Sequence, residues 1–202
     1  HIQSKQDNYS NFVFNQLPGG PLAGNFLHSL FEFSDFQKKD FVDVIKLSGK
    51  QYPSVYNKAN SEMYHELIHH TLQSKIPIPG SFRLSDIPNS DKIPELEFFF
   101  SLKEFSPTAL AGLAKTSGIM DFGQIKGMMH GFVDLLFRHE DKYYILDWKS
   151  NKLGSKIEDY NHERMEDAIH ANNYHVQYLI YTLAVKRFLE VQLQNFDYRT
   201  HF

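Results

Sequence analysis

The stretch GFVDLLFRHEDKYYILDWKS, residues 131–150, contains the pattern that predicts the centre of the fold. Two runs of aliphatic and aromatic residues flank the dipeptide Glu140-Asp141. Aspartate tolerates the left-handed backbone conformation that a tight hairpin turn requires. The pattern therefore predicts two antiparallel strands, over residues 130–139 and 142–149, joined by a two-residue turn.

The predicted turn determines which residues of the two strands face each other. If His139 pairs with Lys142, Asp134 lies directly opposite Asp147, with Cβ atoms about 5 Å apart. Two buried carboxylates in that position must share a proton or bind a cation. Strand alternation places Lys149 on the face of Asp147. Oxygen donors favour Mg²⁺ or Mn²⁺ over structural zinc, but a buried ion cluster without chemistry is an equally open interpretation.

Composition excludes several classes of protein. The chain has 202 residues, of which 42% are hydrophobic and 15% aromatic, so it can bury a core and is not disordered. The absence of Cys excludes a disulfide scaffold, a Cys-ligated metal site and thiol catalysis, and it suits a reducing cytosol. The longest apolar run, residues 178–185, is too short to span a bilayer. With 21 basic and 24 acidic residues and no basic block, the chain would not hold DNA by phosphate neutralisation alone.

Helical and strand patterns occupy most of the remaining chain. Residues 1–16 are polar and are expected to form a linker or arm, and residues 17–202 are expected to form one domain. Apolar periodicity predicts helices over residues 22–33, 61–73, 106–115, 164–173 and 174–191, and a further strand over residues 96–102. This order of elements predicts a mixed α/β domain with a central mixed sheet flanked by helices.

Four motifs resemble the C-terminal nuclease domain of the RecB subunit of bacterial exonuclease V, within the PD-(D/E)xK nuclease superfamily. Residues 131–154 follow that family's G-(F/I)-(I/V)-D and L-D-(Y/W)-K-S-N pattern almost throughout. AGNFLHSLFE, residues 23–32, is similar to its first motif, and PELEFFF, residues 94–100, resembles its acidic strand. YHVQYLIYTLAVKRFL, residues 174–189, is similar to its Q-x-x-x-Y helix. The one departure from the superfamily name is Val133, which stands where the name has proline.

The resemblance implies a role for each matching residue. The implied metal-binding groups are the side chains of His28, Asp134 and Asp147 and the backbone carbonyl of Trp148. Lys149 would orient or activate the attacking water, and Glu95 would be the acidic strand residue, with Glu97 as the alternative register. Gln177 and Tyr181, one helical turn apart, would support the site or position DNA. The expected cofactor is Mg²⁺, with Mn²⁺ as the alternative.

The same resemblance implies a metal-dependent DNA nuclease of the exodeoxyribonuclease V type. It would hydrolyse phosphodiester bonds of single strands fed by a helicase, during double-strand break repair and degradation of linear DNA in the bacterial cytoplasm. The implied partners are RecC-like and RecD-like subunits. ATP-driven unwinding would belong to sequence N-terminal to this chain, and a further strand would follow Phe202. The alternative is a non-catalytic module that keeps the fold for contact between subunits.

A second metal motif offers a different interpretation. His65-Glu-Leu-Ile-His69 fits the H-E-x-x-H pattern of zinc metalloproteases on a predicted helix. The chain contains 11 His, which makes a chance match unsurprising, and residues 70–75 lack the extension that would supply a third ligand in one large group of these enzymes. A solvated, His-rich helix face is the simpler interpretation, and a zinc peptidase is kept as a remote alternative.

Overall fold

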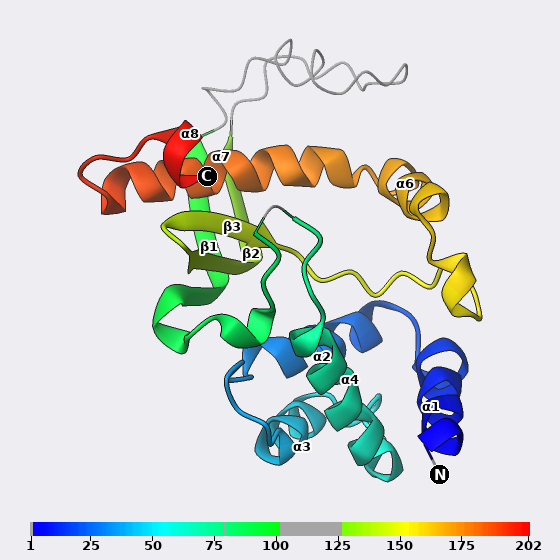
Figure 1. Cartoon of the computed structure of the whole chain (residues 1–202). Coiled ribbons are helices and arrows are strands. Elements are labelled where there is room, and N and C mark those ends of the chain that lie inside the picture. Colours follow the sequence, from blue (N-terminus) through cyan, green and yellow to red (C-terminus); the bar gives the residue numbers. More distant parts are fainter. Residues whose placement is uncertain (1, 79, 102–126) are drawn as a thin grey trace.

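The computed structural model describes residues 2–78, 80–101 and 127–202, and it shows a sheet with helices on both sides (Figure 1). The sheet has the order β1-β2-β3, formed by β1 (Lys92–Ser101), β2 (Met128–His139) and β3 (Lys142–Leu146). Both strand pairs are antiparallel. The predicted α/β architecture is confirmed, but the described strands form an antiparallel sheet rather than a mixed one.

The hairpin between β2 and β3 has the predicted turn and register. Glu140 has a φ of 48° and Asp141 a φ of 63°, so both turn residues adopt the left-handed conformation of a tight hairpin. Leu135 pairs with Leu146 in the ladder, as the predicted register requires. The predicted second strand is too long, because β3 ends at Leu146 and residues 147–149 leave the ladder.

Seven α-helices are defined within the described ranges. They are α1 (Ile2–Asn11), α2 (Pro21–Glu32), α3 (Val42–Gln51), α4 (Ser61–Gln73), α6 (His162–Ala171), α7 (Tyr174–Gln192) and α8 (Tyr198–His201). Four of the predicted helices are present within two residues of their predicted bounds, and the one predicted over residues 106–115 lies outside the described residues. None of the described helices combines the length and the apolar character needed to cross a bilayer.

Two segments differ from the expectations drawn from their sequence. Residues 1–16 were expected to form a linker or arm, but the described part is helical and Phe12 is buried, with its ring packed edge-on against Tyr64. Helix α3 was not predicted. Gly49 of this helix is buried against Tyr56. A Cβ at this position would come within 2.5 Å of the Tyr56 ring, so the glycine allows close packing and does not break the helix.

The sheet separates two apolar cores, with α2, α3 and α4 on one side and α7 on the other (Figure 1). The first core contains Phe26 and Leu30 of α2, Ile45 of α3, Tyr64 and Ile68 of α4, and Leu135 and Phe137 of β2. The second core contains Val133 and Leu136 of β2, and Tyr181, Val185 and Leu189 of α7. Strand β2 therefore contributes to both cores.

The alternation of side chains along β2 is interrupted near its middle. Val133 packs in the second core but Leu135, two residues later, packs in the first. Asp134 lies at this interruption. The register of β1 and β2 places Glu95 opposite Asp134, and Glu95 has a φ of 48°, in the left-handed region that is unfavourable for a glutamate. Backbone strain of this kind is concentrated at functional sites.

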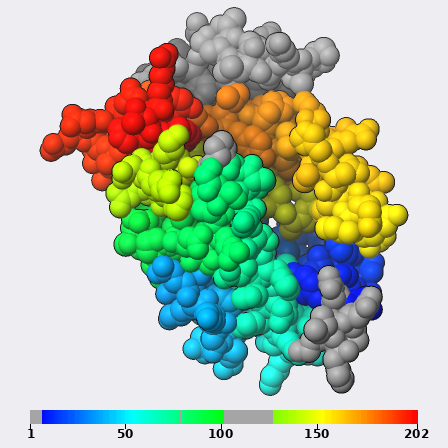
Figure 2. All heavy atoms as spheres, viewed as in Figure 1, coloured from blue at the N-terminus to red at the C-terminus, as the bar shows by residue number. Residues whose placement is uncertain are grey.

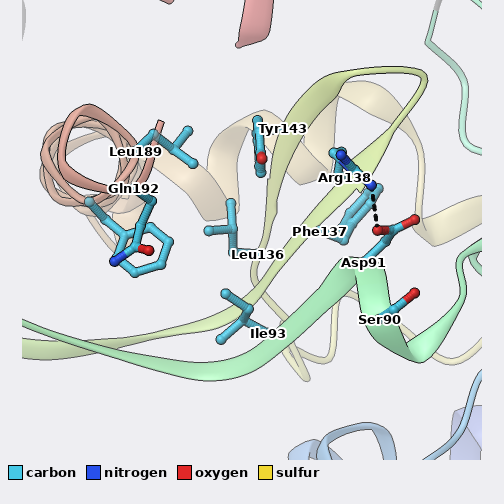
Figure 3. A pocket seen from close by; sticks show the side chains of 10 residues that line it. Ser90, Asp91, Ile93, Leu136, Phe137, Arg138, Tyr143, Leu189 and Gln192 are labelled. Atoms are coloured by element: carbon cyan, nitrogen blue, oxygen red, sulfur yellow. Dashed lines mark hydrogen bonds and ion pairs between the residues drawn. The ribbon is translucent and has the colours of Figure 1, made fainter. Parts of the chain in front are cut away.

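A cavity of about 250 Å³ lies between the C-terminal half of α7 and the sheet (Figure 3). Its walls include Leu136 and Leu189, and Gln192 of α7 lies on the side opposite Arg138 and Asp91 (Figure 3). Its charged lining residues, Arg138 and Asp91, are joined to each other at 2.9 Å. This cavity lies against the face of the sheet that α7 covers.

Candidate active site

Helix α2 brings His28 to the sheet. The helix begins at Pro21, whose fixed φ suits the first helical turn, and its inner face packs Phe26 and Leu30 in the first core. This packing directs His28 towards β2, where its Nδ1 lies 3.4 Å from Asp134 Oδ2.

Asp134 connects β2 with the segment that follows β3. Its side chain is 11% exposed, and its Oδ2 accepts a hydrogen bond of 2.7 Å from the backbone N–H of Trp148. This bond explains why β3 ends early, because the chain turns towards Asp134 instead of continuing the ladder. Burial raises the pKa of Asp134, and the Trp148 hydrogen bond and the His28 charge partly oppose that shift. A cation near this carboxylate would favour its charged form.

Asp147 and Lys149 form an ion pair beside Asp134. The side chain of Asp147 is 5% exposed, and its buried Oδ2 contacts the Lys149 ammonium but accepts no hydrogen bond of normal geometry. Lys149 Nζ also donates to Gln177 Oε1 at 2.8 Å, and Gln177 Nε2 donates to the Tyr181 hydroxyl at 2.8 Å. A chain of polar contacts therefore runs from Asp147 to helix α7.

Glu95, and not Glu97, belongs to this group of acids. Burial raises the pKa of Glu95 to about 7, with smaller contributions from the charges of Asp134 and Glu32. Glu97 instead shares a hydrogen bond of 2.9 Å with His130. The structure thus places Glu95 close enough to Asp134 for their charges to interact.

Tyr181 borders the same group of carboxylates. Burial raises its pKa to about 12, and the charges of Asp147, Asp134 and Glu95 act in the same direction, whereas the hydrogen bond from Gln177 opposes them. The charges of these three carboxylates therefore act on the Tyr181 hydroxyl. Figure 2 shows a hollow in the visible face, bordered by N-terminal residues in blue and by the yellow segment ahead of α6.

Trp148 is held between α2 and the sheet. Its ring stacks on Phe31 with centroids 4.2 Å apart and an interplanar angle of 21°. A Cβ at Gly24 would lie 3.1 Å from Ser150 Oγ, so the absence of a side chain at Gly24 lets α2 approach this segment closely. Helix α2 therefore positions both His28 and the residues after β3.

The sequence analysis did not single out Tyr174. Its ring lies 4.3 Å from Lys149 Nζ, and its hydroxyl donates to Asn151 Oδ1 at 2.9 Å. The available signal was the spacing of three residues between Tyr174 and Gln177, which places both on one face of α7. That spacing is too common to be used without the tertiary contact.

The residues brought together at this site fit a hard divalent cation by their chemistry. His28, Asp134, Asp147 and Glu95 offer carboxylate oxygens and one imidazole, the donors suited to Mg²⁺ or Mn²⁺. Within the described part of the chain, no group of three His, Asp or Glu side chains is arranged to hold a metal ion. The buried Asp147 Oδ2 accepts no hydrogen bond of normal geometry, and this oxygen could serve as a ligand to such an ion.

The H-E-x-x-H motif does not assemble a comparable site. His65 Nε2 lies 3.0 Å from the Lys39 carbonyl oxygen, and its ring packs on Phe41. His69 instead packs edge-on against His70, with ring centroids 6.0 Å apart. The two histidines of the motif thus have separate local partners, and this geometry gives no support to a zinc peptidase.

Sequence comparison identifies several relatives that are named RecBCD enzyme subunit RecB. No model of a known protein family matches the chain. The chain is 35% identical to the RecBCD enzyme subunit RecB of Haemophilus influenzae, over 97% of this chain and 16% of that protein. It is also 35% identical to RecB of Escherichia coli and 32% identical to RecB of Borreliella burgdorferi, over 93% and 86% of this chain. The chain spans about 16% of the length of the first two relatives, and over nearly all of its own length it is similar to this part of RecB subunits of RecBCD enzymes.

Proposed function

We propose that this chain is the metal-dependent nuclease part of a RecBCD-type enzyme, with a PD-(D/E)xK fold, and that it hydrolyses DNA phosphodiester bonds. The observation that supports this best is the grouping of Asp134, Asp147 and Lys149 where β2 meets the end of β3. The names of the relatives add that proteins of this family are subunits of RecBCD enzymes.

The side chains of the site have separate tasks in this proposal. Asp134 and Asp147, with His28 and the Trp148 carbonyl, would hold Mg²⁺ or Mn²⁺. When bound, such an ion lowers the pKa of a coordinated water and neutralises charge on the phosphate. The Lys149 ammonium would attract the phosphate as a point charge or orient the attacking water.

The contacts around Lys149 prepare it for this task. Gln177 accepts a hydrogen bond from the ammonium, and Tyr181 in turn accepts one from Gln177. Both partners lie on α7, which the second core fixes against the sheet. The ammonium is therefore held in place before substrate arrives, which reduces the reorganisation needed during the reaction.

We also propose that RecC-like and RecD-like subunits deliver single strands to this site. The formal net charge of −3 gives the chain little general attraction for a polyanion. A strand supplied by partner subunits would not require that attraction.

The single tryptophan allows metal binding to be measured apart from catalysis. Trp148 is the chain's only Trp and donates its backbone N–H to Asp134. We expect Mn²⁺, which is paramagnetic, to quench Trp148 fluorescence to saturation in wild type but not in Asp147→Asn. The carboxylate of Asp43 is exposed and lies 3.9 Å from Lys46 Nζ, so Asp43→Asn is the matched control and should behave as wild type.

Cleavage of linear single-stranded DNA with Mg²⁺ then tests the reaction. Lys149→Ala should retain the quenching but lose cleavage by roughly 10²-fold or more, since a positioned charge at the reacting phosphate is removed. Equal cleavage by wild type, Asp147→Asn and Lys149→Ala would refute the assigned site. Saturable quenching without cleavage, even in the assembled enzyme, would favour the non-catalytic module instead.

A further inference from the structure

A row of exposed rings leads away from the candidate active site along β1 and β2. Phe132 precedes Asp134 by two residues, and Val133 between them points into the second core. Phe132 therefore points to the side of the sheet that α2 covers, the side from which His28 of α2 contacts Asp134. In the same direction along the sheet, Phe99 of β1 and His130 of β2 are direct cross-strand partners. These three residues, Phe99, His130 and Phe132, are called the ring row below.

The rings of this row are ordered by their mutual contacts. His130 stacks on Phe99 with centroids 4.1 Å apart and an interplanar angle of 7°, and it meets Phe132 edge-on at 5.2 Å. The His130 ring is held by a hydrogen bond of 2.9 Å that its Nε2 donates to Glu97 Oε1.

Packing among the described residues does not explain the ring row. Phe99 is 62% exposed and Phe132 is 43% exposed, and neither belongs to the two apolar cores. Burying a phenylalanine side chain is favourable, so rings left in solvent beside one another suggest a contact that forms with another molecule.

We propose that the ring row stacks the bases of an unpaired nucleic acid strand whose backbone reaches the candidate active site. Alternate residues of a strand are about 6.6 Å apart, so the row extends over roughly two such steps from Asp134. Exposed aromatic residues on a sheet bind unpaired RNA and DNA in this way, and the contact tolerates any sequence because every base has a π-face. A duplex, whose bases are stacked internally, could not use the row.

The inference rests on the proposed function only in its placement of the cleaved phosphate near Asp134. Base stacking itself requires no metal ion and no hydrolysis. The cavity of Figure 3 is a poorer place for the strand, because it lies against the opposite face of the sheet and its Arg138 is already neutralised by Asp91.

The test measures binding of a fluorescently labelled 12-nucleotide DNA strand by fluorescence anisotropy, at low salt in EDTA. A second strand, otherwise identical, lacks several consecutive central bases. Phe99→Leu keeps an apolar side chain but removes the π-face, whereas Phe99→Tyr keeps the π-face. We expect Phe99→Leu to weaken binding of the intact strand about 5-fold or more, and Phe99→Tyr to bind as wild type. The strand without central bases should bind all three proteins equally.

A control is Tyr198→Leu, which removes a ring that is 44% exposed and lies outside the row, and it should leave binding unchanged. Three results would overturn the proposal: no binding of the intact strand by wild type, equal binding by Phe99→Leu and wild type, or the same loss for both strands. Equal binding by the Leu and wild-type proteins would point to an apolar contact with a protein segment. Failure of the nuclease proposal is separately visible in the Mn²⁺ and cleavage measurements, which do not depend on this row.

Discussion

The position of Lys149 depends on several partners. Its ammonium contacts Asp147, donates to Gln177 and lies over the ring of Tyr174. The tyrosine is itself anchored through its hydroxyl to Asn151, two residues beyond the lysine. Tyr174 therefore acts on the site through Lys149, as a positioning residue.

Replacing Tyr174 separates its two contacts. Tyr174→Phe keeps the ring under the ammonium and loses only the bond to Asn151, whereas Tyr174→Leu loses both. We expect kcat for cleavage of single-stranded DNA to fall about 5- to 30-fold in the Leu variant, as a cation–π contact of about 1–2 kcal/mol predicts, and to change less in the Phe variant. A change in KM alone would show that Tyr174 contacts substrate instead.

Glu95 makes stability depend on pH in a defined direction. Its pKa is raised from the model-compound value of 4.5 to about 7 in the folded state, mainly by burial. Between these values the folded state binds more protons than the unfolded state, so stability is lost as the pH rises through this window. In EDTA, Glu95→Gln should therefore be more stable than wild type at pH 8, and this advantage should shrink towards pH 5.

Urea unfolding at both pH values measures this effect. The control is Glu158→Gln, which removes an exposed carboxylate, and its difference from wild type should remain constant over the same range. A Glu95→Gln advantage that is equal at pH 5 and pH 8 would mean that the charge of Glu95 is not the cause.

At the level of the elements, local sequence predicted what depends on local chemistry. The hairpin turn at Glu140 and Asp141 and the register beyond it follow from turn propensity and apolar pattern, and both are confirmed. The early end of β3 was missed, because it depends on the contact of Trp148 with Asp134. Helix α3 was not predicted, and it ends at Gln51, two residues before Pro53.

Gly131 of β2 lies too close to a neighbouring ring to carry a side chain. It pairs with Phe98 of β1, and a Cβ at Gly131 would come within 2.7 Å of that ring. The Phe98 ring packs edge-on against Tyr181, so it cannot move without disturbing the second core. Gly131→Ala should lower the free energy of unfolding by about 1–3 kcal/mol, measured by urea denaturation. Gly19→Ala, where no atom lies within 4 Å of the added Cβ, should be near neutral.

Over the whole molecule, the candidate site could be predicted only in part from spacing. The hairpin alone indicated Asp134, Asp147 and Lys149, since turn geometry relates them. His28 and Gln177 come from helices far away in the sequence, and only the resemblance to a known family indicated them. Tyr174 and the ring row were found only in the structure, because their significance depends on contacts between strands or between a helix and a loop.

The two cores should unfold together, because β2 belongs to both. Leu136 packs under α7 in the second core and is 1% exposed, whereas Trp148 packs at the edge of the first core. Leu136→Ala should lower the free energy of unfolding by about 2–5 kcal/mol, and Trp148 fluorescence should report the same shift in urea midpoint as far-UV circular dichroism. Val191→Ala, at a position on α7 that is 83% exposed, should shift neither signal. Leu136→Ala could instead shift the circular dichroism transition and leave the fluorescence transition in place. That result would mean that the sheet does not couple the two cores. Helix α7, whose Gln177 accepts a hydrogen bond from Lys149, could then detach while the first core stays folded.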